Sequence, residues 1–251
     1  IDNSAIETGS YRPKNSGGAY SKSITLEDAF ASSSNVAAVR LLRQVGDEKV
    51  IDMARDLGVT APMEKGDPSL ALGTSSMTLL ELTAAYAAVA ANSYPVEPRA
   101  FKAEEKGWFE NLISGPSSFG SDEHEEIEQM LRAAVNRGTG RAARLPQANF
   151  GKTGTSQDNR DALFVGYANG LVVGVWIGND DNTPLKGISG GGLPARIWRD
   201  FMTEASGKKA PPRPKAVDPT GPVEPLDIPD IGDIPIGDRT RVGQSRGGER
   251  G

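Results

Sequence analysis

The chain has 251 residues and a formal net charge of −5, and it contains no cysteine. This length suits one sizeable domain or two small ones, and the missing cysteine excludes disulfides, thiolate catalysis and cysteine-based zinc sites. The part expected to fold has no block of basic residues to neutralise phosphates, which argues against nucleic-acid binding, and no apolar run is long enough to cross a bilayer.

The first part of the chain carries helical patterns with clear start and stop signals. Thr25-x-x-Asp28 resembles a capping box with Asp in place of Glu, and Thr78-x-x-Glu81 is a complete one. Gly46 ends one of the helical patterns, as glycine at a helix C-terminus commonly does. These signals predict helices over residues 25–31, 36–45, 48–57, 78–92 and 125–137.

The predicted strands follow these helices. Three stretches rich in β-branched and aromatic residues cover 148–157, 161–169 and 171–180, and the Asn-Gly pair between the last two is typical of a two-residue hairpin turn. A glycine-rich loop then leads into a final helix over 194–205. Helices followed by an antiparallel meander and a last helix predict an α+β fold, with helices packed on an antiparallel sheet.

We expect the chain to divide into a folded domain, residues 1–206, and a tail, residues 207–251. Eight of the 17 prolines lie between Pro211 and Pro235, and the tail has neither a helical nor a strand period. Segments of this composition cannot bury enough apolar surface to fold, so the tail is predicted to be disordered, with short polyproline II runs.

The stretch GKTGT, residues 151–155, is the first candidate site. A phosphate-binding P-loop would need a glycine where the chain has Pro146, and it would open a helix, whereas two further strands follow this stretch. The P-loop is therefore excluded. On a strand, Thr153 and Thr155 share one face and Lys152 lies on the other. An exposed lysine on an edge strand can also serve only to prevent aggregation.

A run of turn-forming residues, Ser32–Asn35, interrupts the first helical region and is the second candidate site. Ser33 and Asn35 could both face a cleft there, although these residue types also form plain polar turns. His124 is the only histidine and lies in an acidic helix start, where we expect it to be solvated. It is unsuited to a Ser-His-Asp triad, and a histidine-based metal site would lack partners, so no metal or other cofactor is predicted.

Together and in this order, Ser33-x-Asn35 and Lys152-Thr153-Gly154 resemble the second and third motifs of the penicillin-recognising serine acyl transferases. The surrounding sequence, from about residue 11 to residue 203, closely resembles the transpeptidase domain of class A, bifunctional penicillin-binding proteins. The stretches that carry this resemblance are ITLEDAFASSSNVAAVRLL, LALGTSSMTLLELTAAYAAVAAN and GKTGTSQDNRDALFVGYANGLVVGVWIGNDDNTPLKGISGGGLPARIWRDFM.

The resemblance implies a D,D-transpeptidase that cross-links peptidoglycan. In this family a serine attacks the D-Ala-D-Ala end of a stem peptide, and a lysine one helical turn later takes its proton. The acyl group then passes to an amine of a neighbouring stem, whereas β-lactams mimic the donor and stay attached. The donor would lie antiparallel to the strand, where Gly154 leaves it room.

The resemblance also implies a role for each matching residue. Ser33 would relay protons toward the leaving amine, and Asn35 would bind the donor peptide. Lys152 would add positive potential beside Ser33 and attract the terminal carboxylate, to which Thr153 and Thr155 would hydrogen-bond. The backbone N–H of Thr155 would form half of an oxyanion hole.

The family's first motif, Ser-x-x-Lys, is missing before Ser33, so the nucleophile and its general base are absent from this chain. The match from Ser206 to Lys209 comes in the wrong order and is attributed to chance. We therefore expect the C-terminal part of a longer protein, soluble and inactive when isolated. The parent would act at the periplasmic face of the bacterial inner membrane, held by a membrane anchor upstream.

The same residues leave other interpretations open. A D,D-carboxypeptidase or a serine β-lactamase would use these motifs with water as acceptor, and a non-catalytic chain would bind peptidoglycan or a partner. The expected partners are stem peptides ending in D-Ala-D-Ala and β-lactams, with no nucleic acid.

Two structural expectations also remain. The loop 189–192 would either shape the cleft or merely connect. The strand at 171–180 is expected to have lost a neighbouring strand and to expose an apolar edge.

Overall fold

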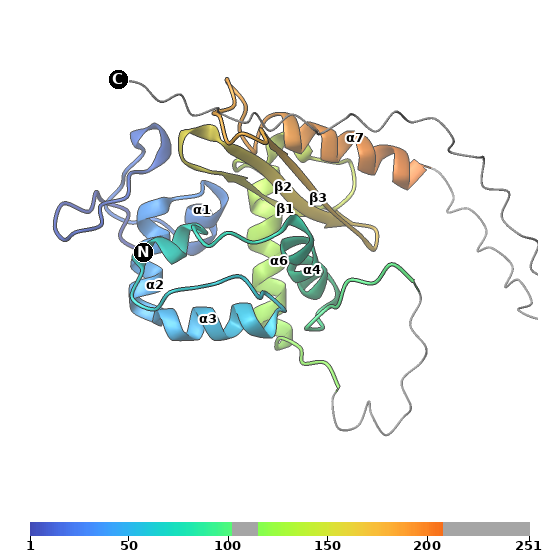
Figure 1. Cartoon of the computed structure of the whole chain (residues 1–251), viewed down its shortest axis with the longest axis horizontal. Helices are drawn as coiled ribbons and strands as arrows, with labels where there is room; N and C mark the ends of the chain where they lie inside the picture. The colour runs from blue at the N-terminus through green and yellow to red at the C-terminus, as the bar shows by residue number, and fades with distance from the viewer. Residues whose placement is uncertain (102–114, 208–251) are drawn as a thin grey trace, which may run out of the picture. The chain divides into compact units, whose positions relative to one another are not determined.

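The computed structural model describes residues 1–101 and 115–207 (Figure 1). From residue 208 onward, the predicted tail lies outside these ranges. The helices and strands lie where the sequence predicts them, to within a few residues. The helices are α1 (Leu26–Ala31), α2 (Asn35–Val45), α3 (Asp47–Asp56), α4 (Leu79–Ala91), α6 (Ser121–Asn136) and α7 (Leu193–Gly207), and the strands are β1 (Phe150–Thr155), β2 (Asp161–Ala168) and β3 (Leu171–Gly178).

The strands form one antiparallel sheet in the order β1-β2-β3, which together with the helices confirms the predicted α+β fold. Asn169 and Gly170 join β2 to β3, and both have positive φ, 52° and 73°, as the predicted hairpin turn requires. Lys152 of β1 lies opposite Val165 of β2. Within residues 1–101 and 115–207, β1 pairs with β2 alone, so it is an edge of this sheet.

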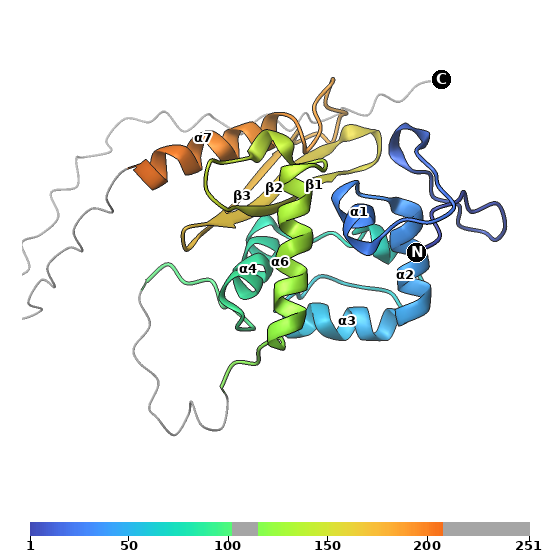
Figure 2. The same ribbon diagram turned by 180° about the vertical axis from the view of Figure 1, so that it is seen from behind.

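Helices cover both faces of the sheet (Figures 1 and 2). α7 packs on β2 and β3 from one side, where the rings of Phe164 and Trp198 meet edge to face, 5.2 Å apart. The Trp198 indole N–H donates to the carbonyls of Gly166 and Val173, so this buried side chain is also hydrogen-bonded. None of the helices in residues 1–101 and 115–207 combines the length and the apolar character needed to cross a bilayer.

α4 covers the other face of the sheet, together with α6. It begins at the predicted capping box, in which Thr78 Oγ1 accepts from the N–H of Glu81 and the Glu81 carboxylate accepts from the N–H of Thr78. Hydrogen bonds from the Thr60 hydroxyl and from the backbone of Thr78 and Thr60 lower the pKa of Glu81 to about 2. A Cβ on Gly174 of β3 would come within 2.3 Å of Thr83 Oγ1, so glycine lets α4 lie this close.

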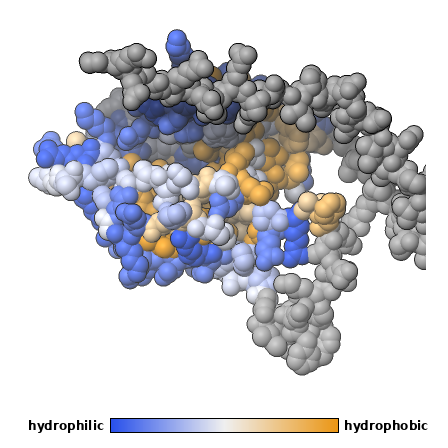
Figure 3. All heavy atoms as spheres, in the orientation of Figure 1, coloured by the Kyte–Doolittle hydropathy of each residue, from blue (hydrophilic) through white to orange (hydrophobic). Residues whose placement is uncertain are grey.

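Among the described residues, β3 pairs on one side only and forms the second edge of the sheet. Its side chains include Leu171 and Trp176, which are 39% and 46% exposed. Figure 3 shows apolar residues in the region of the sheet and α4, on the face that Figure 1 presents. Two large apolar side chains of this edge strand are thus partly exposed, and the loss of a neighbouring strand stays a prediction.

We expect the backbone amides of β3 to exchange with solvent faster than those of β2, because β2 is hydrogen-bonded to a strand on each side. Hydrogen–deuterium exchange followed by NMR over residues 171–178 of this chain tests the prediction, with β2 as the internal reference. Protection of every β3 amide to the level of β2 would contradict it.

Candidate active site

The predicted turn Ser32–Asn35 separates α1 from α2. Ser34 caps α2 by accepting a hydrogen bond from the N–H of Ala37 at 3.2 Å. Ser33, just before it, has a φ of 55°, a left-handed conformation that costs a residue with a side chain about 1–2 kcal/mol. The reversal turns the Ser33 hydroxyl toward β1, where it meets Lys152.

Lys152 of β1 reaches this turn with its ammonium group. The group donates to Ser33 Oγ and, at 3.3 Å, to the carbonyl of Thr153, and it lies 5.6 Å from the centre of the Phe30 ring. Burial lowers the pKa of Lys152 from 10.5 to about 8. A lysine with this pKa exists in both charge states near neutral pH, so it can donate a proton to Ser33 or accept one from it.

Further hydroxyl groups continue from Ser33 along β1. The Thr139 hydroxyl lies 3.4 Å from Ser33 Oγ and 2.6 Å from Thr153 Oγ1. Thr155 Oγ1 accepts a hydrogen bond from the N–H of Gly190 at 3.0 Å. The strand, the α1–α2 turn, the end of α6 and the loop before α7 therefore meet at one place.

These groups border a cavity of about 1000 Å³. All six residues of the predicted site line it, which means that the structure brings together two motifs 119 residues apart in the sequence. The predicted site residues are Ser33, Asn35, Lys152, Thr153, Gly154 and Thr155. Another part of the cavity wall is apolar, formed by Leu26, Ala29, Phe30, Ala37, Ala38, Leu41, Ala71, Leu72 and Tyr86.

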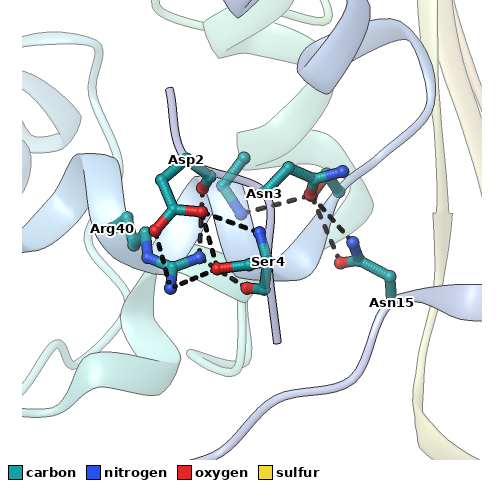
Figure 4. Close-up of polar contacts among 7 residues, drawn as sticks. Asp2, Asn3, Ser4, Asn15 and Arg40 are labelled. Carbon is teal, nitrogen blue, oxygen red and sulfur yellow. Dashed lines mark hydrogen bonds and ion pairs between the residues drawn. The ribbon is translucent and has the colours of Figure 1, made fainter. Parts of the chain in front are cut away.

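The segment before α1 holds the turn through a buried amide network that the sequence did not predict. Asn3, Asn15 and Ser34 are 4%, 7% and 7% exposed. Asn15 Nδ2 and Ser34 Oγ both donate to Asn3 Oδ1, at 2.9 and 2.6 Å, and Asn15 Oδ1 accepts from the N–H of Val36 at 3.0 Å. Figure 4 shows Asn3 and Asn15 facing one another, with Arg40 of α2 binding the same segment beside them.

The same segment orients Asn35. The Asn35 amide donates through Nδ2 to the carbonyl of Lys14 at 2.8 Å, while the side chain still lines the cavity. One residue of the Ser33-x-Asn35 motif therefore contacts Lys152, the middle residue is buried in the amide network, and the last is tied to Lys14. Each of the three side chains is therefore oriented by a hydrogen bond to a different part of the structure.

His124 lies outside the site, and the prediction that it is solvated is wrong. It is half-buried near the start of α6, and its Nε2 lies 2.7 Å from the carbonyl oxygen of Val89. The Val89 carbonyl lies in the last turn of α4 and also accepts from the N–H of Asn92 at 3.1 Å, so His124 adds a second hydrogen bond at this helix end. Within residues 1–101 and 115–207, no cluster of three or more His, Asp or Glu residues could hold a metal ion.

Thr139 is a part of the site that the sequence does not identify, since it predicts only that a helix ends near residue 137. For the loop 189–192, the structure decides between the two alternatives: Ser189 and Gly191 line the cavity. A Cβ on Gly138 would come within 2.1 Å of the carbonyl oxygen of Ala31, and one on Gly191 within 2.4 Å of that of Thr139. The available signal was a polar residue placed between glycines directly after a helix.

The family model for the penicillin binding protein transpeptidase domain matches residues 2–203. The chain is 40% identical over 185 residues to penicillin-binding protein 1A of Aquifex aeolicus, which covers 71% of this chain and 25% of that protein. It is 31% identical over 210 residues to penicillin-binding protein 2D of Bacillus subtilis, covering 78% of this chain and 30% of that protein. The chain thus spans 25–30% of the length of these curated relatives.

Solved structures share the fold. Penicillin-binding protein 1A from Haemophilus influenzae matches with a TM-score of 0.70 at 23% identity, covering 87% of this chain and 40% of that chain. The PonA1 protein from Mycobacterium tuberculosis, solved in complex with penicillin V, matches with a TM-score of 0.66 at 20% identity, covering 87% of this chain and 66% of that chain.

Proposed function

The chain belongs to the penicillin-binding protein transpeptidase domain family, with class A proteins of type 1A among its relatives, and on that premise we propose that it supplies two motifs of a peptidoglycan D,D-transpeptidase site. The observation that carries the proposal is the contact of Lys152 with Ser33 at the edge of one cavity. The proposed partners are stem peptides ending in D-Ala-D-Ala and β-lactams. The proposed location is the periplasmic face of the bacterial inner membrane.

The reaction would be an acyl transfer through a serine ester. The serine oxygen attacks the carbonyl carbon of the penultimate D-Ala, the bond to the terminal D-Ala breaks, and the leaving amine takes up a proton. An amine of a neighbouring stem peptide then attacks the ester, and the serine recovers its proton. A β-lactam forms the same kind of ester by opening its ring, so no fragment leaves.

In this proposal Ser33 passes the proton to the leaving amine, and Lys152 holds Ser33 in place while adding positive potential to the site. A lysine whose pKa lies near 8 suits this role, because it can return a proton to Ser33 after each transfer. Asn35 would hold the donor peptide, and Thr153 and Thr155 would bind its terminal carboxylate.

The donor peptide would lie along β1. An edge strand offers unpaired backbone groups, so a peptide can add to it antiparallel, and the N–H of Thr155 would form half of the oxyanion hole. Gly154 lies on the same strand and lines the cavity. A Cβ there would come within 2.8 Å of the Leu163 side chain, so packing inside the sheet already requires glycine at this position.

The nucleophile would come from a segment that these 251 residues do not include, since no Ser-x-x-Lys precedes Ser33. The apolar part of the cavity wall, with Phe30, Leu41 and Leu72, offers that segment a surface on which to pack. A serine presented there would lie beside Ser33 and Lys152. The missing motif also favours one alternative, a non-catalytic chain that binds the stem peptide without forming an ester.

Intact mass spectrometry after incubation with benzylpenicillin tests the proposal, on this chain alone and on the full product of its gene. We expect the full product to gain the mass of one penicillin and this chain to gain none. If the isolated chain gains the mass of a penicillin, the nucleophile lies within its 251 residues, and our assignment of the nucleophile to another segment is wrong. If neither is labelled, the non-catalytic function replaces the proposed one. Release of free D-Ala without cross-linked product would instead identify a D,D-carboxypeptidase.

A further inference from the structure

Thr139 stands between the two motifs and belongs to neither. Its hydroxyl is within hydrogen-bond distance of Ser33 Oγ, at 3.4 Å, and of Thr153 Oγ1, at 2.6 Å. Its side chain is exposed and lines the same cavity. The Thr139 hydroxyl therefore has one partner in each motif, so it can transmit an orientation from one to the other.

A hydroxyl group has one proton to donate and two lone pairs that accept, whereas an ammonium group only donates. The ammonium group of Lys152 donates to Ser33 Oγ, and in both hydroxyl–hydroxyl contacts either oxygen can be the donor. One arrangement gives every group in the chain a partner: Ser33 donates to Thr139, and Thr139 donates to Thr153. In that arrangement the proton of Thr153 remains to be donated into the cavity. Each bond of such a chain polarises the next.

We propose that Thr139 is a positioning residue of the site: its hydroxyl joins Ser33 to Thr153 and so orients the Thr153 hydroxyl as a donor toward the terminal carboxylate of a donor peptide or β-lactam. This inference rests on the proposed transpeptidase function. No proton is transferred to or from Thr139 in this role, because it acts only through the direction of its hydrogen bonds. Without it, Thr153 could rotate and present a lone pair to the anion.

The backbone around Thr139 is built tightly enough for this task. The N–H of Thr139 donates to the carbonyl of Ala31 at 3.0 Å, which ties it to the end of α1 beside Ser33. Arg137, two residues earlier, forms ion pairs with Glu27 and Asp28 of α1. The backbone of Thr139 is thus held beside Ser33, at the position from which its hydroxyl contacts both motifs.

The test compares two ligands that differ only in the carboxylate. Rates of acylation are measured on the full gene product with benzylpenicillin and with its methyl ester, which carries no negative charge. We expect Thr139→Val to slow the reaction with benzylpenicillin about tenfold, as loss of a hydrogen bond to a charged group typically does, and to affect the ester little. The ratio of the two rates should therefore fall.

Two further variants separate positioning from a general effect on the fold. Thr139→Ser keeps the hydroxyl and should preserve the wild-type ratio, whereas Thr139→Ala should behave like the valine variant. Thr203→Val is the matched control, since the Thr203 hydroxyl lies away from the cavity and donates within α7, to the carbonyl of Arg199 at 2.8 Å.

An unchanged ratio in Thr139→Val and Thr139→Ala, or equal losses in the serine and valine variants, would overturn the inference and leave the proposed function intact. A wild-type protein that does not react with benzylpenicillin at all would overturn the proposed function itself. The two failures are therefore distinguishable in one set of measurements.

Discussion

Replacing Lys152 by methionine is expected to stabilise the folded chain at pH 7 and, in the full gene product, to slow the reaction with penicillin. The gain in stability is expected because the ammonium group of Lys152 is buried, which costs free energy in the folded state. Methionine has a similar length and no charge, so it fills the space without that cost. The loss of reaction should be about a thousandfold, because the group next to Ser33 that carries the positive charge is removed.

The ionisation of Lys152 determines how the free energy of unfolding of the wild-type chain changes with pH. Burial lowers the pKa of Lys152 to about 8 in the folded chain, against 10.5 for an ordinary lysine. Below pH 8 the ammonium is charged in both states, and the folded state carries the full cost of burial. Between these two pKa values the unfolded chain binds more protons, so the free energy of unfolding rises with pH. Above them the cost is gone.

The pKa difference corresponds to about 3 kcal/mol at most, and the lost hydrogen bonds to Ser33 and to the Thr153 carbonyl offset about half of it. Urea denaturation of this chain from pH 7 to pH 11 measures the net effect. The advantage of Lys152→Met should be largest at pH 7 and shrink above pH 8. Lys49→Met, at an exposed position of α3, is the control. A variant that is less stable than wild type at pH 7 would contradict the prediction.

Replacing Asn15 by alanine is expected to cost about 3 kcal/mol of folding free energy, because it leaves the buried N–H of Val36 without a partner and removes three further hydrogen bonds. The N–H of Val36 and the carbonyl of Ala19 would each lose their hydrogen bond to Asn15. Asn3 and Ser34 would lose one each as well. The turn that carries Ser33 should loosen with them.

Asn179→Ala is the matched control for this experiment. The Asn179 side chain makes two hydrogen bonds, to the carbonyl and the hydroxyl of Thr183, but it is exposed, so its loss should cost no more than about 0.5 kcal/mol. Urea denaturation of both variants gives the comparison. Equal costs for the two replacements would show that the burial of the amide network contributes nothing.

Signals that act over a few residues were sufficient to predict most of the fold. The Asn169-Gly170 turn has the positive φ angles that only such residues adopt readily, and Thr78 and Glu81 form the predicted capping box. The strand alternation also places Lys152 and Thr153 on opposite faces of β1. In each case, the physical cause lies within one element or one turn.

The parts of the site that escaped prediction depend on distant partners. Thr139 meets Ser33 across 106 residues, and Asn3 meets Ser34 across 31. No local pattern tells an asparagine that will be buried in a network from one that will stay in solvent. His124 shows the same limit, because its partner is a carbonyl at the end of another helix, 35 residues away.

The distance in sequence between Ser33 and Lys152, 119 residues, also has a kinetic consequence. Closing so long a loop costs more chain entropy than making a local contact, so we expect the contact between Ser33 and Lys152 to form late in folding. A chain that has not finished folding therefore contains both motifs before they come together as a site. On the proposed function, it could neither engage a donor peptide nor be trapped by a β-lactam, and either ligand would favour the completed fold by mass action.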